Sequence, residues 1–181
     1  MESMIKAEIA ESIQALRLPA YDEIPTVGLF LDQTAKYISE YLMPLQDQAL
    51  TGSMISNYVK KKMISNPVKK QYSRDQICYL LFISVAKNVL SLEEIQWFID
   101  LQKKTYSIPV AYNYFCDELK NVIFWVFELR DHMDKVGTDK TDEKAILRNI
   151  IMAVAYKVYL NKCVSVLAKH QRVNEEQAEL H

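Results

Sequence analysis

One short segment concentrates side chains that can bind phosphate and contact base edges. Between Thr51 and Gln76 the sequence has six basic residues and one acid, Asp75, although the whole chain has a formal net charge of −1. A local excess of positive charge attracts nucleic-acid phosphates, and in a chain that is not basic overall such a surface must be local. The six basic residues are Lys60, Lys61, Lys62, Lys69, Lys70 and Arg74.

The helix predicted over residues 51–63 divides its side chains between two faces. At about 100° per residue, Ile55, Tyr58 and three further apolar residues fill one half of the helical wheel. From a helix in a major groove, asparagine can pair with adenine and lysine can reach guanine or phosphate. We therefore predict that Ser53, Ser56, Asn57, Lys60 and Lys61 face the groove, and that Lys62, Lys69, Lys70 and Arg74 contact phosphates.

The other reactive side chains predict no catalytic or metal site. His132 lies between Asp131 and Asp134 but has no second His or Cys one turn away, so a histidine at a helix C-terminus is the better interpretation. Cys78 falls in an apolar helix, where a thiol would be inert. The three glycines are too far apart for a phosphate-binding loop. We predict no enzyme activity, no cofactor and no metal.

The elements that must position the basic segment are all predicted to be helices. Glycine and proline are scarce, and few β-branched runs alternate with period two. Residues 19–25, bounded by two prolines, are predicted to be extended. The fold class is therefore all-α, with about seven helices. They are expected over residues 2–17, 27–43, 51–63, 73–89, from 91 onward, from 109 to about 133, and over 142–171.

Several helix ends carry recognisable signals. Thr51, Ser73 and Ser91 are predicted N-caps, and Ser91 forms a capping box with Glu94. Pro109 is expected at the start of the sixth helix. Residues 134–141 are predicted to be a loop, and the polar tail after residue 172 is expected to fray.

We predict two units. Residues 1–106 would form a helix-turn-helix domain with an N-terminal helix, and residues 107–181 a C-terminal helical hairpin that packs on it or dimerises. The many aromatic residues of 97–127 predict packing in a core or interface and leave open a pocket for a small-molecule effector. Between residues 150 and 156 the last helix is apolar on every side, as in a helix buried by several neighbours or by a partner subunit.

The cysteines and the apolar runs predict a cytoplasmic protein without membrane contact. Three sparse cysteines without a CxxC pair are typical of reduced thiols. Strongly apolar runs such as residues 122–127 are far shorter than the roughly 20 residues that span a bilayer.

A second pattern runs through residues 50–99. It consists of Ile55, Tyr58, Met63, Ile64, Pro67, Lys69, Lys70, Tyr72, Ser73 and the run 91–95. These residues resemble the DNA-binding end of MerR-type regulators, in which a recognition helix with an aromatic residue is followed by an apolar pair, a proline, a basic wing, Tyr-Ser and an SLEEI helix. The resemblance implies a MerR-like helix-turn-helix with residues 51–63 as recognition helix.

Residues 21–99, which begin YDEIPTVGLFLDQ, are more closely similar to a bacterial family called domain of unknown function 1836. The resemblance implies DNA binding through the same helix-turn-helix and adds no activity. It is carried by Tyr21, Ile24, Pro25, Leu29, Asp32, Gln33, Thr51, Met54, Ile55, Asn57, Tyr58, Lys70, Tyr72, Ser73 and Leu92.

We predict a transcriptional regulator that binds double-stranded DNA through the 51–63 helix, as a homodimer, because two-fold dimers fit paired half-sites. The alternative is an α-helical protein-interaction or scaffold module without DNA binding. Three departures from the MerR pattern motivate it: Lys62 replaces a usual glycine, Ser56 replaces a usual arginine, and the wing is shorter. The interaction-module alternative predicts that the lysine face is a solvated surface that the function does not need, as many lysine runs are. It also predicts an apolar patch on the last two helices.

Overall fold

The structure is a computed structural model that describes residues 2–45, 48–138 and 140–179. Within these residues it has seven α-helices, one 3₁₀ helix and one two-stranded sheet, which confirms the all-α fold class. The elements are α1 (Glu2–Glu11), η1 (Tyr21–Glu23), β1 (Leu29–Phe30), α2 (Leu31–Leu42), α3 (Gly52–Lys60), β2 (Gln71–Tyr72), α4 (Arg74–Ala86), α5 (Leu92–Gln102), α6 (Ile108–Val126) and α7 (Asp142–Glu179).

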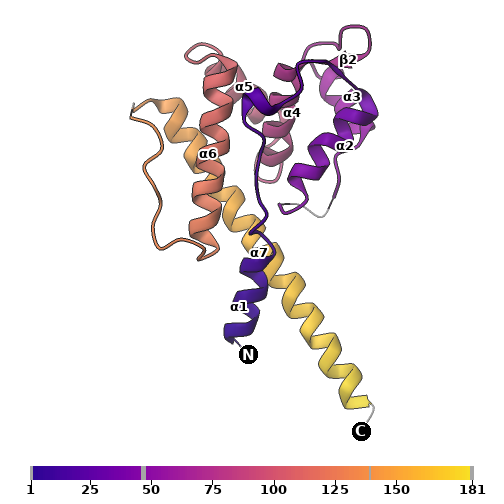
Figure 1. Cartoon of the computed structure of the whole chain (residues 1–181), viewed down its shortest axis with the longest axis vertical. Coiled ribbons are helices and arrows are strands. Elements are labelled where there is room, and N and C mark those ends of the chain that lie inside the picture. Colours follow the sequence, from indigo (N-terminus) through magenta and orange to yellow (C-terminus); the bar gives the residue numbers. More distant parts are fainter. Residues whose placement is uncertain (1, 46–47, 139, 180–181) are drawn as a thin grey trace.

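Helix α4 is the central element, as its apolar composition predicts. Ten of its thirteen residues are buried, and it contacts α2, α6 and α7. Helices α6 and α7 form the hairpin predicted for the C-terminal part, and α7 continues well beyond it (Figure 1). Helix α1 packs on α7 and lies far from α3, which is near the opposite end of the molecule (Figure 1).

The predicted caps are confirmed. The hydroxyls of Thr51, Ser73 and Ser91 accept backbone N–H groups in the first turns of α3, α4 and α5, at 3.2 to 3.4 Å. The box at Ser91 is closed by Glu94, whose carboxylate accepts the Ser91 N–H at 2.7 Å. Pro109 lies in the first turn of α6. These caps satisfy backbone donors that have no partner inside the helix.

The prediction of a helix over residues 27–43 is wrong in its first turn. Leu29 and Phe30 form β1, which pairs antiparallel with β2 in the register Leu29↔Tyr72 and Phe30↔Gln71. A Cβ atom on Gly28 would lie only 2.7 Å from the Cβ of Gln71, so glycine allows the strands to approach. This pairing joins segments about 40 residues apart, and helical periodicity carries no information about it.

Other helix ends also differ from the prediction. Helix α1 ends at Glu11 rather than 17, α3 at Lys60 rather than 63, and α4 at Ala86 rather than 89. Helix α6 stops at Val126 because Glu128 takes a left-handed φ of 57° and Leu129 N–H bonds back to the Phe124 carbonyl at 2.8 Å. Helix α7 continues to Glu179 instead of fraying after residue 172. The predicted 134–141 loop lies between α6 and α7, and its residue 139 is outside the described residues.

One helix meets the length and composition of a membrane span. The segment Asp142–Arg172 of α7 has a window with a mean hydropathy of 1.5, of which 33% is buried inside the protein. Counting consecutive apolar residues overlooked it, because lysines such as Lys157 and Lys162 interrupt the run. A core helix of a soluble protein passes the same test.

Candidate nucleic-acid interface

Helix α3 is held to the protein by its apolar face. Ile55 is fully buried and Tyr58 is 4% exposed, so both belong to the core. The polar side chains Ser53, Ser56, Asn57 and Lys60 are exposed on the other side. Helix α2 contacts both α3 and β2, and through them it positions the two basic segments that follow α3 and precede α4. The division into two faces that the wheel predicts is therefore present.

A tight C-terminal turn ends α3 and exposes two more lysines. The Lys62 N–H bonds to the Val59 carbonyl at 2.9 Å, and the Met63 N–H bonds to the Tyr58 carbonyl at 3.0 Å. This pair of bonds is a Schellman motif, which needs a left-handed residue after the helix. Lys62 supplies it with a φ of 60°. Glycine adopts this left-handed conformation more readily than lysine does.

The segment predicted to be a wing is a two-residue hairpin turn, which we call the wing turn. Val68 and Gln71 exchange two backbone hydrogen bonds of 3.1 and 2.9 Å. Between them Lys69 has a φ of 50° and Lys70 a φ of 65°, as in a type I′ turn, where Asn-Gly is the favoured pair. Both lysines are exposed. The turn therefore exposes two lysines to solvent, and their left-handed backbone has a conformational free-energy cost that Asn-Gly would avoid.

The exposed polar side chains of α3 and of the two lysine-bearing turns that follow it make up one candidate surface, which we call the lysine surface. Among the described residues, Lys61 is its only member with an ion pair, to Glu93 on α5 at 3.7 Å. Both side chains are largely exposed, so solvent screens that pair. The lysine surface consists of Ser53, Ser56, Asn57, Lys60, Lys61, Lys62, Lys69 and Lys70, all of them exposed.

Arg74, the ninth predicted residue, has a different environment. Its side chain is only 19% exposed. Its Nε donates to the Ile24 carbonyl at 2.8 Å, and its guanidinium lies 4.9 Å from the centre of the Tyr21 ring. Asp22 lies 3.4 Å from the same guanidinium. Arg74 thus ties the start of α4 to the segment before β1, and we assign it a positioning role.

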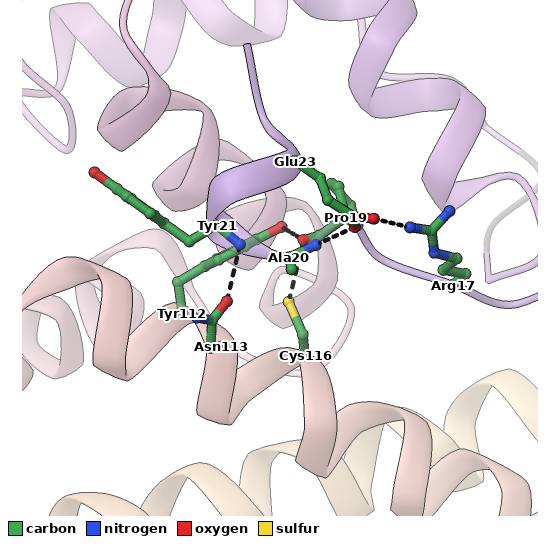
Figure 2. Close-up of polar contacts among 8 residues, drawn as sticks. All are labelled: Arg17, Pro19, Ala20, Tyr21, Glu23, Tyr112, Asn113 and Cys116. Atoms are coloured by element: carbon green, nitrogen blue, oxygen red, sulfur yellow. Dashed lines mark hydrogen bonds and ion pairs between the residues drawn. The ribbon is translucent and has the colours of Figure 1, made fainter. Parts of the chain in front are cut away.

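That segment, residues 17–24, is a strap between α4 and α6. The prediction that residues 19–25 are extended is wrong over residues 21–23, which form the 3₁₀ helix η1. The Tyr21 hydroxyl donates to Asp75 at 2.7 Å, and this bond together with burial raises the pKa of Tyr21 to about 12. On the α6 side, Figure 2 shows the Tyr112 hydroxyl donating to the Pro19 carbonyl at 2.9 Å and the Tyr21 N–H donating to Asn113 at 2.8 Å. The pair of prolines was the only sequence signal for it.

The remaining reactive side chains are not brought together. In the part of the chain that the structure describes, no group of three or more His, Cys, Asp or Glu could hold a metal ion. The prediction that His132 ends a helix is wrong, because α6 stops at Val126 and His132 lies in the following loop, 3.5 Å from Asp134. Burial raises the pKa of the Cys78 thiol, and that of Cys116 to about 12, so neither is an activated nucleophile.

Comparison with known proteins identifies a family for the part of the chain that carries the lysine surface. A family model described as "Domain of unknown function (DUF1836)" matches residues 19–115. The match runs from the strap into α6 and extends past the predicted limit at residue 99. No curated protein and no solved structure matches the chain.

Proposed function

Because this chain belongs to the family described as Domain of unknown function (DUF1836), its membership assigns no activity, and we propose from the lysine surface that it is a DNA-binding transcriptional regulator. Helix α3 has nine residues and is about 13 Å long, which suits insertion into a major groove about 12 Å wide. Asn57, Lys60 and Lys61 would face the bases with Ser53 and Ser56 beside them, while Lys62, Lys69 and Lys70 would contact phosphates.

One observation carries the proposal. Lys62, Lys69 and Lys70 have left-handed backbone conformations, which cost an L-residue with a Cβ roughly 1–2 kcal/mol each. Glycine or asparagine would occupy these positions more cheaply. An ordinary solvated lysine could be placed anywhere on the surface. Ammonium groups held at three unfavourable positions around α3 are explained by a polyanionic ligand that needs charge at these sites.

The test is fluorescence anisotropy of the full chain with a randomised duplex pool and with its own upstream DNA, over a range of salt concentrations. We expect binding that weakens steeply with salt. A Lys60→Ala/Lys61→Ala variant should bind at least about tenfold more weakly, because it loses two contacts to base edges that are worth roughly 1–3 kcal/mol each. The Lys135→Ala/Lys140→Ala variant removes the same charge from the exposed loop between α6 and α7 and should behave like the parent.

Two outcomes would overturn the proposal. One is the absence of binding at low salt. The other is equal weakening in both double variants, because charge loss anywhere would then explain the effect and α3 would have no special role.

We further propose that the DNA-binding form is a homodimer joined through α7. Four apolar side chains, 47% to 67% exposed, follow one face of this helix: Tyr156, Leu160, Val164 and Leu167. Their spacing of four, four and three residues places them on a single stripe. In a two-fold contact each copy contributes the same stripe, so one apolar face on each subunit is sufficient.

The α7 stripe also favours the second candidate function, an α-helical protein-interaction module. That alternative expects an apolar patch on the last two helices together with a dispensable lysine surface. A chain that self-associates through α7 but gives no DNA binding in the anisotropy experiment would establish it in place of the regulator.

For localisation we propose the cytoplasm, without membrane contact. Support comes from the packing of α7, which contacts α1, α4, α5 and α6. The test is flotation of the purified chain with phosphatidylcholine and phosphatidylglycerol vesicles. Recovery of the protein with the vesicles would contradict the proposal.

A further inference from the structure

The small sheet brings two exposed apolar side chains together beside the wing turn. Phe30 of β1 is paired with Gln71 of β2, and Gln71 is also paired with Val68 across the wing turn. Residues directly opposite each other in antiparallel strands have their side chains on the same face of the sheet. Phe30, Gln71 and Val68 therefore follow one another on one face, and we call Phe30 and Val68 the apolar row.

The face with the apolar row points away from the core. The opposite face carries Leu29 and its partner Tyr72, which is only 4% exposed. Phe30 is 49% exposed and Val68 is 74% exposed. Among the described residues, neither side chain belongs to the hydrophobic core or packs against it. Val27 is also exposed, but it lies outside β1 and is not part of the row.

Phe30 occupies a position that favours a small polar residue. It is the N-cap of α2, and its side chain makes no capping hydrogen bond. Serine, threonine, aspartate and asparagine are preferred at an N-cap because their side-chain oxygen accepts a free backbone N–H. A half-exposed phenylalanine contributes neither a cap nor core packing here. A residue that departs from the local preference in this way is typical of a binding surface.

The apolar row is continuous with the lysine surface. Lys69 and Lys70 follow Val68 directly in the chain, and both are exposed. Helix α2 contacts α3, β1 and β2, so the sheet and α3 are positioned by the same helix near one end of the molecule (Figure 1). In the proposed complex Lys69 and Lys70 contact DNA phosphates, and each phosphate joins two deoxyribose rings, whose carbon atoms offer an apolar surface.

We infer that Phe30 and Val68 pack against deoxyribose rings of the DNA backbone, beside the phosphates that Lys69 and Lys70 bind. The inference rests on the proposed function, because it concerns the same DNA complex. Contacts to sugar and phosphate fix the position of a protein on the duplex but carry no sequence information. The apolar row therefore adds the same affinity on every sequence, while α3 supplies the selectivity. Thymine methyl groups are a different apolar target, since they lie in the major groove with α3.

The test is fluorescence anisotropy of the full chain with the randomised duplex pool and with its own upstream DNA. We expect Phe30→Ser/Val68→Ala to bind about tenfold more weakly, by the same factor on both DNAs, because apolar area is lost from the contact. Its salt slope should equal that of the parent, since no charge is removed. Met43→Ser/Val110→Ala makes the same kind of change at exposed apolar positions elsewhere and should bind like the parent.

A charge variant separates the two kinds of contact. Lys69→Ala/Lys70→Ala should lower the log-log salt slope by about 2, roughly 0.9 for each lost phosphate contact. The neutral variant of the apolar row and the charge variant of the wing turn would then weaken binding with different salt dependences.

Two further measurements assign the role and the target of the row. Phe30→Ser alone should raise Tm by about 2 °C, because serine caps α2, whereas a phenylalanine with a structural role would lower Tm when replaced. A duplex with uracil in place of thymine lacks only the methyl groups of the major groove. The tenfold loss in Phe30→Ser/Val68→Ala should persist on this duplex.

Three outcomes would overturn the inference while the proposed function stands. They are a parent that binds DNA no better than Phe30→Ser/Val68→Ala, a lower Tm in Phe30→Ser, and disappearance of the loss on uracil DNA, which would assign the row to thymine methyls. A parent that does not bind DNA at low salt would overturn the proposed function and this inference together.

Discussion

Lysine at left-handed positions is the most informative feature at the scale of single residues. Lys62 ends α3, and Lys69 and Lys70 form the wing turn, all with φ between 50° and 65°. The folded state tolerates this because the surrounding hydrogen bonds define each turn. The charge of the lysine surface and the strain of its backbone therefore occur at the same residues, so changes at these sites should affect stability and binding in opposite directions.

We expect the variant Lys69→Asn/Lys70→Gly to be more stable than the parent and to bind DNA more weakly. Asn-Gly fits a type I′ turn, and the net gain should be about 1 kcal/mol, or roughly 2–4 °C in Tm for a chain of this size. Urea unfolding monitored by circular dichroism and anisotropy with duplex DNA measure the two effects. A loss of stability would show that the lysine side chains hold the turn in place.

At the scale of elements, two buried polar residues of α6 connect this helix to the following loop and to α7. Asn121 exchanges two hydrogen bonds of 2.8 Å with the backbone of Asp134, which anchors the loop between α6 and α7. Glu118 is fully buried and faces Arg148 of α7, with its Oε1 3.0 Å from the Arg148 Nε. Burial outweighs the attraction of the guanidinium and the influence of the Asn121 side chain, and raises the pKa of Glu118.

A raised carboxyl pKa predicts a pH dependence with a definite sign. The folded state favours protonated Glu118 more than the unfolded state does, so its contribution to stability is complete below pH 4.5 and is lost as pH rises through the higher folded pKa. The variant Glu118→Gln has no ionisable group at this position, so its stability does not fall in this way as the pH rises. We therefore expect the stability of the parent relative to Glu118→Gln to fall as the pH rises above 4.5. Urea unfolding at several pH values measures it, and a constant or rising difference would contradict the assignment.

At the scale of the whole molecule, the lysine surface and the α7 stripe lie towards opposite ends. Figure 1 shows α3 and β2 near one end and the C-terminal half of α7 extending to the other. The strap connects α6 with the start of α4, because Tyr21 bonds to both Asn113 and Asp75. Figure 2 shows its contacts with α6. In the proposed dimer the exposed stripe of α7 would join the two copies, and α3 of each copy would remain accessible.

We expect the variant Leu160→Glu/Val164→Glu to be monomeric where the parent is a dimer, because each contact would bury four carboxylates. Its affinity for a two-half-site operator should fall more than about tenfold, since the second half-site contact is no longer intramolecular. Sedimentation velocity and anisotropy measure these effects. Val27→Glu/Met43→Glu, with charges at exposed apolar positions outside the stripe, is the matched control. A monomeric parent at micromolar concentration would rule out the dimer.

The sequence by itself determined the features that depend on neighbours a few residues apart. The helical class, the caps at Thr51, Ser73 and Ser91 and the inward face of α3 all follow from local periodicity and local hydrogen bonds. Tertiary structure alone decided the strand β1, the structural position of Arg74 and the buried pair of Glu118 and Arg148. Each of these depends on contacts between segments distant in the chain, which no local pattern records.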